Sequence, residues 1–466
     1  MSEEHRKHLQ FDQALVQGQW LDNPIISIDD LGRIGAVRTD SDIDPWSQEA
    51  ASPKHQIQRI SGAAIPGMVN CHSHAFQRAF VGLSEYRTAT HDSFWTWRKL
   101  MYQFVQTLTP EDVHSIAKRL YRQLLAGGYT WVTEFQYLHH SENGNAYADP
   151  ACMSHALIQA AKEVGIGICI LPVLYQRSGF LETELDPAQR RFACSNDGFL
   201  DILSLLHNQY ASDPNVQVGM AFHSLRAVSI QTIQRIASQY HQLHSAGVIH
   251  IHVAEQQKEV DDCLAATGQR PIAFLLGQAN VDRRWCLIHA TQCNDQERSG
   301  IIKSTATVGL CPTTEANLGD GVFGIASFMA EGGRFAIGSD SNVCTQAAAE
   351  LRLLEYTQRL LQRKRAILGT QQFSVGRNLY QQAVAGGQAA MGRAAAGPQA
   401  GGIQVGQSAD LVILRADDLH QPEAPAPGRT AALQGDRILD RYLFDQSQSM
   451  VQQTFVAGKL VWTSER

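Results

Sequence analysis

The chain has 466 residues, of which 44% are hydrophobic and 18% charged, and its formal net charge is -6. This length exceeds one minimal domain and predicts a large barrel domain with a smaller appended unit. The acidic balance and the lack of a long basic run argue against nucleic acid as a partner, and no uninterrupted apolar stretch approaches the ~18 residues of a membrane span.

Nine cysteines are scattered along the chain without a CxxC pair. Several fall in apolar runs, for example Cys169 in GICILPVL and Cys286 in WCLIHA, where a thiol is typically a small buried side chain. The amino-terminal stretch is polar and has no apolar signal region. We therefore expect a reduced protein of the cytoplasm.

Both ends of the chain predict β-structure. Residues 11–64 contain short alternating runs such as ALVQGQWL, broken by turn residues. Towards the carboxyl end the strand-like runs are GGIQVGQSADLVIL, RILDRYLF and MVQQTFVAGKLVW, with QPEAPAPGR as a loop between them. Such spacing is typical of a small β-rich unit. We expect residues 1–64 and 394–466 to pair into one β-sandwich.

Residues 65–393 alternate short apolar runs with helical patterns, which predicts a (β/α)8 TIM barrel. The eight candidate strands are AAIPGMVNCHSH, TWVTEFQYL, GICILPVLY, VQVGMAFHSLRA, VIHIHVAE, WCLIHAT, TATVGLCPTT and RFAIGSDS. The clearest helix is TPEDVHSIAKRLYRQLLAGG, with Thr109 as its cap and Pro110 in its first turn. Residues 177–199, after the third strand, are either a lid over the active-site face or a plain excursion.

Residues that can bind or serve a metal stand at the ends of several predicted strands. They are His72, His74, His252, His289 and Asp340. Active sites of such barrels lie at the carboxyl ends of the strands. Taken singly, each histidine could be a polar core residue and the aspartate a helix cap, but five on one face predict a metal centre. Nitrogen and oxygen ligands without thiolate favour Zn²⁺, with Fe²⁺ or another divalent ion as alternatives.

Glu255 lies three residues after His252, in HVAE. It could stabilise the first turn of the next helix. It could also act as a general acid and base, because a metal lowers the pKa of bound water and a nearby carboxylate can take that proton. Zinc nucleobase deaminases use a glutamate that is not a ligand in this way.

The motifs HSH, HVAE, LIHA and GSD together resemble the amidohydrolase superfamily in its mononuclear deaminase form. The fourth predicted strand, AFHSLRA, has no lysine of the kind that bridges two metals in binuclear members. GGIQVGQSADLVIL also resembles these enzymes, whose sandwich is built from both chain ends. NCHSHAFQRAFVGLSEYR, DSFWTWRKLMYQF and TEFQYLHH are similar to the deaminases that act on N-formimino-L-glutamate in histidine degradation.

This resemblance implies four ligands to one metal ion per subunit, a pair that transfers protons, and a homodimer. The implied ligands are His72, His74, His252 and Asp340, and the implied pair is Glu255 and His289. A hydroxide held by the metal would attack the formimino carbon, with Glu255 as the proton shuttle and with Asp340 and His289 steadying the intermediate. His289 would either ligate the metal or hydrogen-bond its hydroxide.

The substrate implied by the resemblance is a small dianion derived from an amino acid, with an amidine-like formimino group. Arg226 and Arg98 are expected to hold its carboxylates. Gln77, Tyr137 and His223 are further candidates for binding it. Alternatively, Arg98 is a surface residue stacked on the neighbouring tryptophans, and Tyr137 and His223 are simply packed.

The expected reaction yields N-formyl-L-glutamate and ammonia. One alternative is another deaminase of the superfamily that acts on a heterocyclic amine such as guanine. A second is a barrel that only binds or assembles with other molecules. The intact metal motifs and Glu255 argue against the second alternative.

Overall fold

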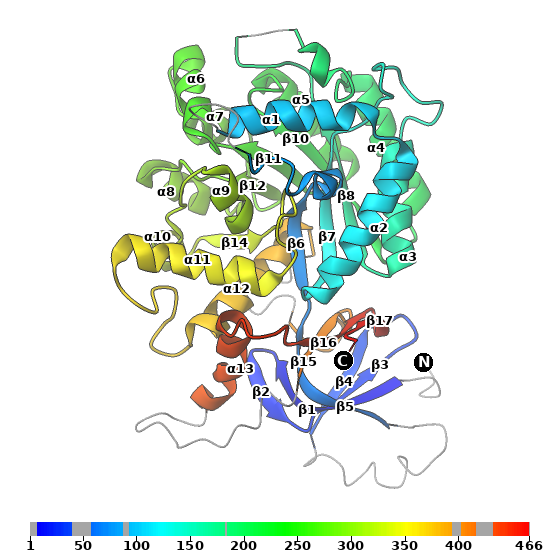
Figure 1. Ribbon diagram of the computed structural model, residues 1–466, viewed down its shortest axis with the longest axis vertical. Helices are drawn as coiled ribbons and strands as arrows, with labels where there is room; N and C mark the ends of the chain where they lie inside the picture. Colours follow the sequence, from blue (N-terminus) through cyan, green and yellow to red (C-terminus); the bar gives the residue numbers. More distant parts are fainter. Residues whose placement is uncertain are drawn as a thin grey trace.

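The computed structural model describes residues 7–39, 57–86, 93–181, 184–393, 402–415 and 432–465. A large barrel of strands ringed by helices stands on a smaller β-unit that contains both the first and the last strand of the chain (Figure 1). No helix in these ranges is long and apolar enough to cross a membrane.

The barrel is a parallel sheet whose strands follow one another around the cylinder in chain order. They are β6 (Met68–Ser73), β7 (Tyr129–Gln136), β8 (Gly167–Leu174), β10 (Met220–Ser224), β11 (Ile249–Val253), β12 (Trp285–His289), β13 (Thr307–Leu310) and β14 (Arg334–Ile337), and β9 (Val216–Val218) pairs with β8 to one side. The amides of Ser339 and Asp340 donate to the carbonyl of His72 at 3.1 and 2.9 Å and close the ring. The predicted (β/α)8 barrel is confirmed.

Closure of the ring depends on a glycine. A Cβ on Gly338, which follows β14, would lie 2.8 Å from both the Cβ and the carbonyl oxygen of His72. Because no real side chain tolerates that distance, only glycine lets the last strand approach the first at this point. The same approach brings the end of β14 next to the HSH motif.

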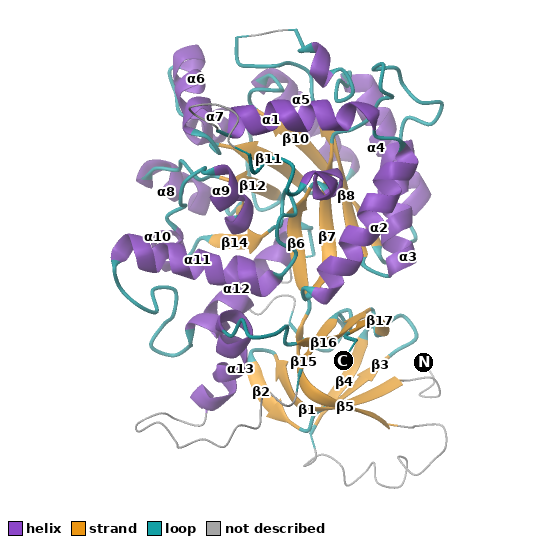
Figure 2. Cartoon of the chain, viewed as in Figure 1, coloured by secondary structure: helices purple, strands orange, loops and turns teal. Residues whose placement is uncertain are grey.

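Helices pack around the outside of the barrel (Figure 2). They are α1 (Phe94–Phe104), α2 (Pro110–Ala126), α3 (Cys152–Val164), α4 (Asn196–Tyr210), α5 (Ile230–Leu243), α6 (Gln257–Thr267), α7 (Pro271–Gln278), α8 (Asp295–Ser304), α9 (Pro312–Leu318), α10 (Ile325–Ala330), α11 (Ala347–Gln362) and α12 (Val375–Ala390), with the short turns η3 (Ala75–Phe80), η4 (Val105–Thr107) and η5 (Pro187–Gln189). The helix predicted after Thr109 is α2, and the Thr109 side chain accepts a hydrogen bond from the Asp112 amide as a cap.

The smaller unit is a second sheet built from both ends of the chain. Its strands are β1 (Lys7–Val16), β2 (Gln19–Asp22), β3 (Ile25–Ile28), β4 (Ile34–Arg38), β5 (Ile57–Pro66), β15 (Leu411–Leu414), β16 (Val451–Val456) and β17 (Lys459–Thr463). β5 and β15 pair antiparallel and so join the amino-terminal part to the carboxyl-terminal part. Phe11, Ile26, Leu411 and Phe455 share a separate buried core. The expectation that both ends form one β-unit is confirmed.

Two predicted strands differ from the structure. RILDRYLF belongs to a helix, α13 (Ala432–Phe444), in which Ile438, Leu439, Tyr442 and Leu443 are buried. That spacing is the helical period, which the short apolar run disguised. AAIPGMVNCHSH is divided at Gly67, because β5 ends in the lower sheet and β6 begins the barrel.

Three other predictions are not tested. QPEAPAPGR lies outside the described residues. The domain limits 1–64, 65–393 and 394–466 remain a prediction, since several of the ranges around them are not described. The same holds for the proposed lid at 177–199.

Candidate metal centre and active site

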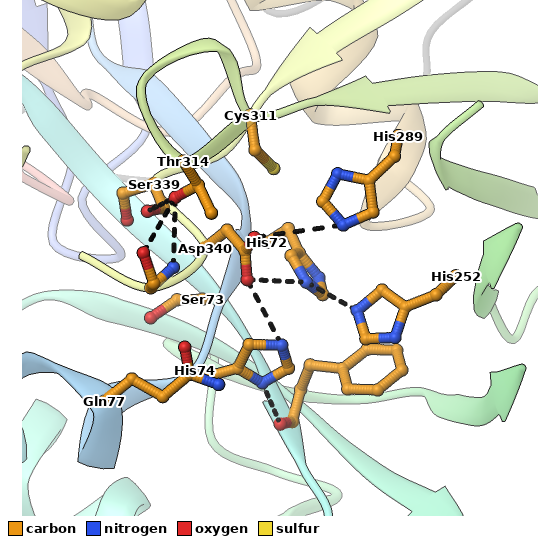
Figure 3. A network of polar contacts seen from close by, with 12 residues as sticks. His72, Ser73, His74, Gln77, His252, His289, Cys311, Thr314, Ser339 and Asp340 are labelled. Carbon is orange, nitrogen blue, oxygen red and sulfur yellow. Dashed lines mark hydrogen bonds and ion pairs between the residues drawn. The ribbon is translucent and has the colours of Figure 1, made fainter. Parts of the chain in front are cut away.

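The five residues predicted from the strand ends meet at the carboxyl end of the barrel (Figure 3). His72 lies near the end of β6 and His74 directly after it, His252 lies on β11, His289 ends β12, and Asp340 follows β14. All five side chains are buried. We call them the imidazole cluster.

Within this cluster four side chains converge on one small volume. Nε2 of His72 lies 2.9 Å from Nε2 of His252. Oδ1 of Asp340 lies 3.5 Å from Nε2 of His72 and 3.3 Å from Nε2 of His74. Nε2 of His289 is farther away, 3.8 Å from Oδ2 of Asp340. The donor atoms form two overlapping groups that share His72, one with His74 and Asp340 and one with His252 and His289. Imidazole nitrogens with a carboxylate oxygen are donors that fit a divalent cation such as zinc.

Hydrogen bonds behind the cluster set which ring nitrogen faces inwards. Nδ1 of His74 lies 3.0 Å from the carbonyl oxygen of Phe135, to which it donates. Its Nε2 therefore presents a lone pair to Asp340 and to the shared volume. Bonds of this kind orient metal-binding histidines and fix their tautomer.

Burial keeps these imidazoles neutral. It lowers the pKa of His72 to about 4 and the pKa of His74 to about 3, so both lone pairs are available at neutral pH. Burial alone would raise the pKa of Asp340, but the hydrogen bond with His72 and the adjacent imidazoles outweigh it and hold that pKa below its usual range. His72, His74 and Asp340 thus offer two neutral nitrogen donors and one anionic oxygen.

Glu255 and His289 form a second pair beside the cluster. Oε1 of Glu255 lies 3.7 Å from Nε2 of His289. Burial, together with the charge of Asp340, raises the pKa of Glu255 to about 7 although the positive charge of His289 opposes it. Burial would lower the pKa of His289, but Glu255, Glu315 and Asp340 raise it to about 10. A carboxyl group that titrates near neutrality beside a protonated imidazole is suited to proton transfer.

The backbone at the strand ends is strained. Ala254, His289, Ala290 and Asp340 have φ of +51°, +69°, +50° and +46°, a left-handed conformation that residues with a Cβ rarely adopt. Each costs about 1–3 kcal/mol and persists only where its surroundings over-determine it. Two of the four strained residues, His289 and Asp340, belong to the imidazole cluster.

Two asparagines that sequence reasoning missed hold the first strand to the last. Asn70 Oδ1 accepts from the Ser339 amide at 3.0 Å, and Asn70 Nδ2 donates to Ser339 Oγ at 2.6 Å. Asn342 Nδ2 donates to the carbonyl oxygens of His74 and Asp340, both at 3.0 Å. Their positions next to HSH and within GSDSN were the available signal. These bonds fix the spacing between two of the candidate ligands.

A cavity of about 40 Å³ opens onto the imidazole cluster. The predicted substrate-binding residues Gln77, Arg98, Tyr137, His223 and Arg226 all line it. Five lining residues were not among the predicted site residues, and most of them come from α1: Phe94, Trp97, Met101, Tyr102 and Leu318. A larger hollow of about 850 Å³ between α1 and residues 178–189 shares Arg98 and Tyr102 with this cavity, so α1 separates the cluster from the outside.

The two arginines have different surroundings. Arg98, on α1, stacks with its Cζ 4.5 Å from the centre of the Trp95 ring, so it both lines the cavity and contacts a tryptophan. Arg226, after β10, is only 6% exposed, and its Nε has no hydrogen-bond partner among the described residues. Its nearest carboxylate oxygen, Oε2 of Glu259, is 4.0 Å away. Arg226 is therefore a buried cation with hydrogen-bonding capacity to spare.

Gln77 and Tyr137 are joined on another wall of the cavity. Gln77 Nε2 donates to the Tyr137 hydroxyl at 3.2 Å. Gln77 Oε1 is buried without a partner among the described residues. The Tyr137 ring also meets the ring of His223 edge to face, with their centres 5.4 Å apart. These side chains are packed against one another and still leave one acceptor free.

A sequence model of the amidohydrolase family matches residues 63–461. The chain belongs to this family. It is 42% identical over 451 residues to a formimidoylglutamate deiminase from Pseudomonas aeruginosa, an alignment that covers 97% of this chain and 93% of the relative. A more distant relative, 24% identical over 382 residues, is an 8-oxoguanine deaminase from the same species, and covers 80% of this chain and 79% of the relative. This amidohydrolase is accordingly a hydrolase of carbon–nitrogen bonds.

Solved structures agree with this assignment. A crystal structure of an amidohydrolase from Brucella melitensis is 39% identical and superposes with a TM-score of 0.86, covering 97% of this chain and 94% of that one. An adenosine deaminase from Xanthomonas campestris with bound zinc is 21% identical, with a TM-score of 0.76 over 97% of this chain and 92% of that one. The second likeness shows that this amidohydrolase shares the fold.

Proposed function

We propose that this amidohydrolase binds one zinc ion, or another divalent ion, per subunit and hydrolyses N-formimino-L-glutamate to N-formyl-L-glutamate and ammonia. The observation that carries the proposal is that cationic and anionic side chains line the same cavity. Arg98 and Arg226 stand among the lining residues together with Glu255 and Asp340. A formimino group is an amidine, a strong base that is cationic at neutral pH, so the substrate has a cationic head and two carboxylates.

A neutral heterocyclic amine would use this arrangement poorly. It has no carboxylate for the buried Arg226, and leaving a buried charge without a partner is costly. Forked hydrogen bonds from an arginine to a carboxylate are strong and directional. The relative from Pseudomonas aeruginosa, whose name describes the deimination of formimidoylglutamate, supports the same substrate.

The metal would be held by His72, His74, His252 and Asp340, whose donor atoms lie in two overlapping groups that share His72. When bound, such an ion supplies Lewis acidity, which makes water a nucleophile at neutral pH and polarises the substrate. His289 lies beside this set and is placed to hydrogen-bond the reacting oxygen. Its Nδ1 is 3.2 Å from Glu315 Oε1, which orients the ring.

Glu255 would carry the proton. It accepts a proton from water as the oxygen adds to the formimino carbon, and it delivers that proton to the nitrogen that leaves as ammonia. The second water proton is released as the formyl carbonyl forms. Positively charged His289 stabilises the negative charge that develops on the oxygen.

The arginines would orient the substrate. Arg226 and Arg98 each bind one carboxylate, and Gln77, Tyr137 and His223 hold the chain between the two ends. Fixing the reacting carbon in this way removes most of the entropic cost of bringing it to the nucleophile.

An assay of ammonia release tests the proposal. Purified protein, with its metal content measured, is offered N-formimino-L-glutamate, N-guanidino-L-glutamate, guanine and 8-oxoguanine. We expect ammonia and N-formyl-L-glutamate in equal amounts from the first compound and none from the purines. Release from a purine alone would establish the heterocyclic alternative, and no release from any compound by the metal-loaded protein would favour a binding protein.

We further infer that the enzyme is a homodimer of the cytoplasm. The nine cysteines are all free thiols, which fits a reducing compartment, and the family resemblance supports the dimer. Light scattering after size exclusion would give twice the mass of the 51.4 kDa chain; a monomer would contradict the inference.

A further inference from the structure

The buried carboxylate of Glu259 lies against two residues that line the cavity, Glu255 and Arg226. Glu259 lies in the first turn of α6 and is fully buried. At that position a glutamate ordinarily serves the helix terminus. Here Gln256, the cap of α6, makes no side-chain capping bond, and the Glu259 side chain reaches back beyond the cap.

The first contact is with the turn that presents the proton shuttle. Glu259 Oε1 accepts a hydrogen bond from the amide of Ala254, and Oε2 accepts one from the amide of Glu255, both at 3.2 Å. Ala254 is the strained residue, with a φ of +51°. Both amides are buried, where an unpaired N–H is costly. The two bonds therefore stabilise the strained turn from which the Glu255 side chain enters the cavity.

The second contact is with the buried arginine. Glu259 Oε2 is also the oxygen that lies 4.0 Å from Nε of Arg226. Of the two side chains, the first is fully buried and the second 7% exposed. The carboxylate partly balances this buried cation while leaving its outer nitrogens for a ligand. The Glu259 side chain thus connects the backbone of Glu255 with the Arg226 guanidinium.

We propose that Glu259 is a positioning residue that aims Glu255 at the reacting centre and holds Arg226 in place for the substrate carboxylate. This inference rests on the proposed function of the site. It predicts that a single neutral substitution at Glu259 impairs turnover and substrate binding together. If Glu259 only stabilised α6, its substitution would leave turnover and substrate binding of the folded enzyme unchanged.

The chain offers a matched control in Glu297, at the start of α8. It is also buried and accepts from two backbone amides, those of Asn294 at 3.1 Å and Ala273 at 3.3 Å. It also pairs with an arginine, since Arg270 Nε lies 2.9 Å from its Oε2. Among the described residues, neither member of that pair lines the cavity.

The test compares Glu259→Gln with Glu297→Gln in the metal-loaded enzyme. Glutamine keeps one acceptor oxygen and turns an amide nitrogen towards the other backbone N–H. For Glu259→Gln we expect kcat for N-formimino-L-glutamate to fall about tenfold to a hundredfold and KM to rise about tenfold, with metal content unchanged. For Glu297→Gln we expect both constants within about twofold of the unsubstituted enzyme, because only a structural contact is lost.

Two further measurements separate the possible failures. Binding of the product N-formyl-L-glutamate, followed by calorimetry, should weaken about tenfold in Glu259→Gln and stay unchanged in Glu297→Gln. In the double variant with Arg226→Gln the loss of affinity should be less than additive, because both changes remove one shared interaction. If the two glutamate variants behave alike, or the double variant is strictly additive, the positioning role is wrong. If the unsubstituted enzyme neither binds the product nor releases ammonia, the proposed function itself fails.

Discussion

The imidazole cluster and a cluster of thiols lie close together in the barrel, with Cys71 directly before His72 on β6 and Cys286 three residues before His289 on β12, yet they have different chemistry. The thiol cluster consists of Cys71, Cys286 and Cys311, which pack with Ile288, Ala336 and Ala390. Both clusters are buried to a similar degree. Burial raises the pKa of Cys71 well above its usual range and keeps that thiol protonated, so Cys71 behaves as a small apolar group.

Burial acts differently on the imidazoles. Neutral imidazoles keep strong lone pairs, and buried polar groups need partners. Nδ1 of His72 has no partner among the described residues, while its Nε2 faces another imidazole nitrogen. The comparison shows that burial alone does not identify the candidate metal site. The candidate metal site is distinguished by polar groups whose lone pairs point towards one another. A bound cation would satisfy these lone pairs together.

Removing the negative charge of Asp340 should have the largest effect, because this residue supplies the anionic oxygen of the imidazole cluster. In Asp340→Asn the neutral nitrogens lose their anionic companion, so we expect metal content to fall and kcat to drop on the order of 10³-fold or more. Elemental analysis and the ammonia assay measure the two effects. Full metal occupancy with unchanged turnover would show that the imidazole cluster is not the reaction centre.

Arg226→Gln should separate binding from metal chemistry. The variant loses a charged, forked contact to a carboxylate, so KM for N-formimino-L-glutamate should rise about 10- to 100-fold. Metal content should not change, because Arg226 is not among the converging donors. An unchanged KM would remove the substrate carboxylate from this position.

Glu134, on β7, should make the stability of the folded protein depend on pH. Its carboxyl group accepts from the Ala75 amide at 2.5 Å and from the Tyr121 hydroxyl at 3.3 Å, and burial raises its pKa to about 8. Between pH 4.5, the ordinary pKa of a glutamate, and about 8, the folded state holds a proton that the unfolded state releases. This contribution to stability is therefore complete below pH 4.5 and is lost as the pH rises through 8.

Glutamine at this position has no proton to lose. We expect the melting temperature of Glu134→Gln to decline less between pH 5 and pH 8.5 than that of the unsubstituted protein, as thermal scans in matched buffers would show. Equal declines in the two proteins would mean that Glu134 is already ionised in the folded state.

The smallest effect is expected in the thiol cluster. Cys286→Ala removes one buried sulfur atom and should lower the free energy of unfolding by about 1 kcal/mol, measured by denaturant titration. KM and metal content should stay as they are. A loss of metal from this variant would show that the two clusters are not independent.

Sequence reasoning succeeded where a residue type and its place on a strand were enough. The HSH, HVAE, LIHA and GSD motifs each end a parallel strand, and parallel strands in a barrel end at one rim. It failed for RILDRYLF, where a short apolar run fits both a helix and a strand. It also missed Tyr102 and Met101, because which face of α1 covers the cavity depends on how that helix docks.

The amino-acid sequence by itself determined the family, the order of the strands and the side chains that can bind a cation, because motif spacing and hydrophobic period are local properties of the chain. Only the tertiary structure decided that Asn70 and Asn342 tie the first strand to the last, that Ala254 and His289 adopt strained conformations, and that Glu259 lies against both Glu255 and Arg226. Most of those features arise from contacts between segments far apart in the chain, such as Asn70 with Ser339 and Glu259 with Arg226, whose energies no local pattern contains.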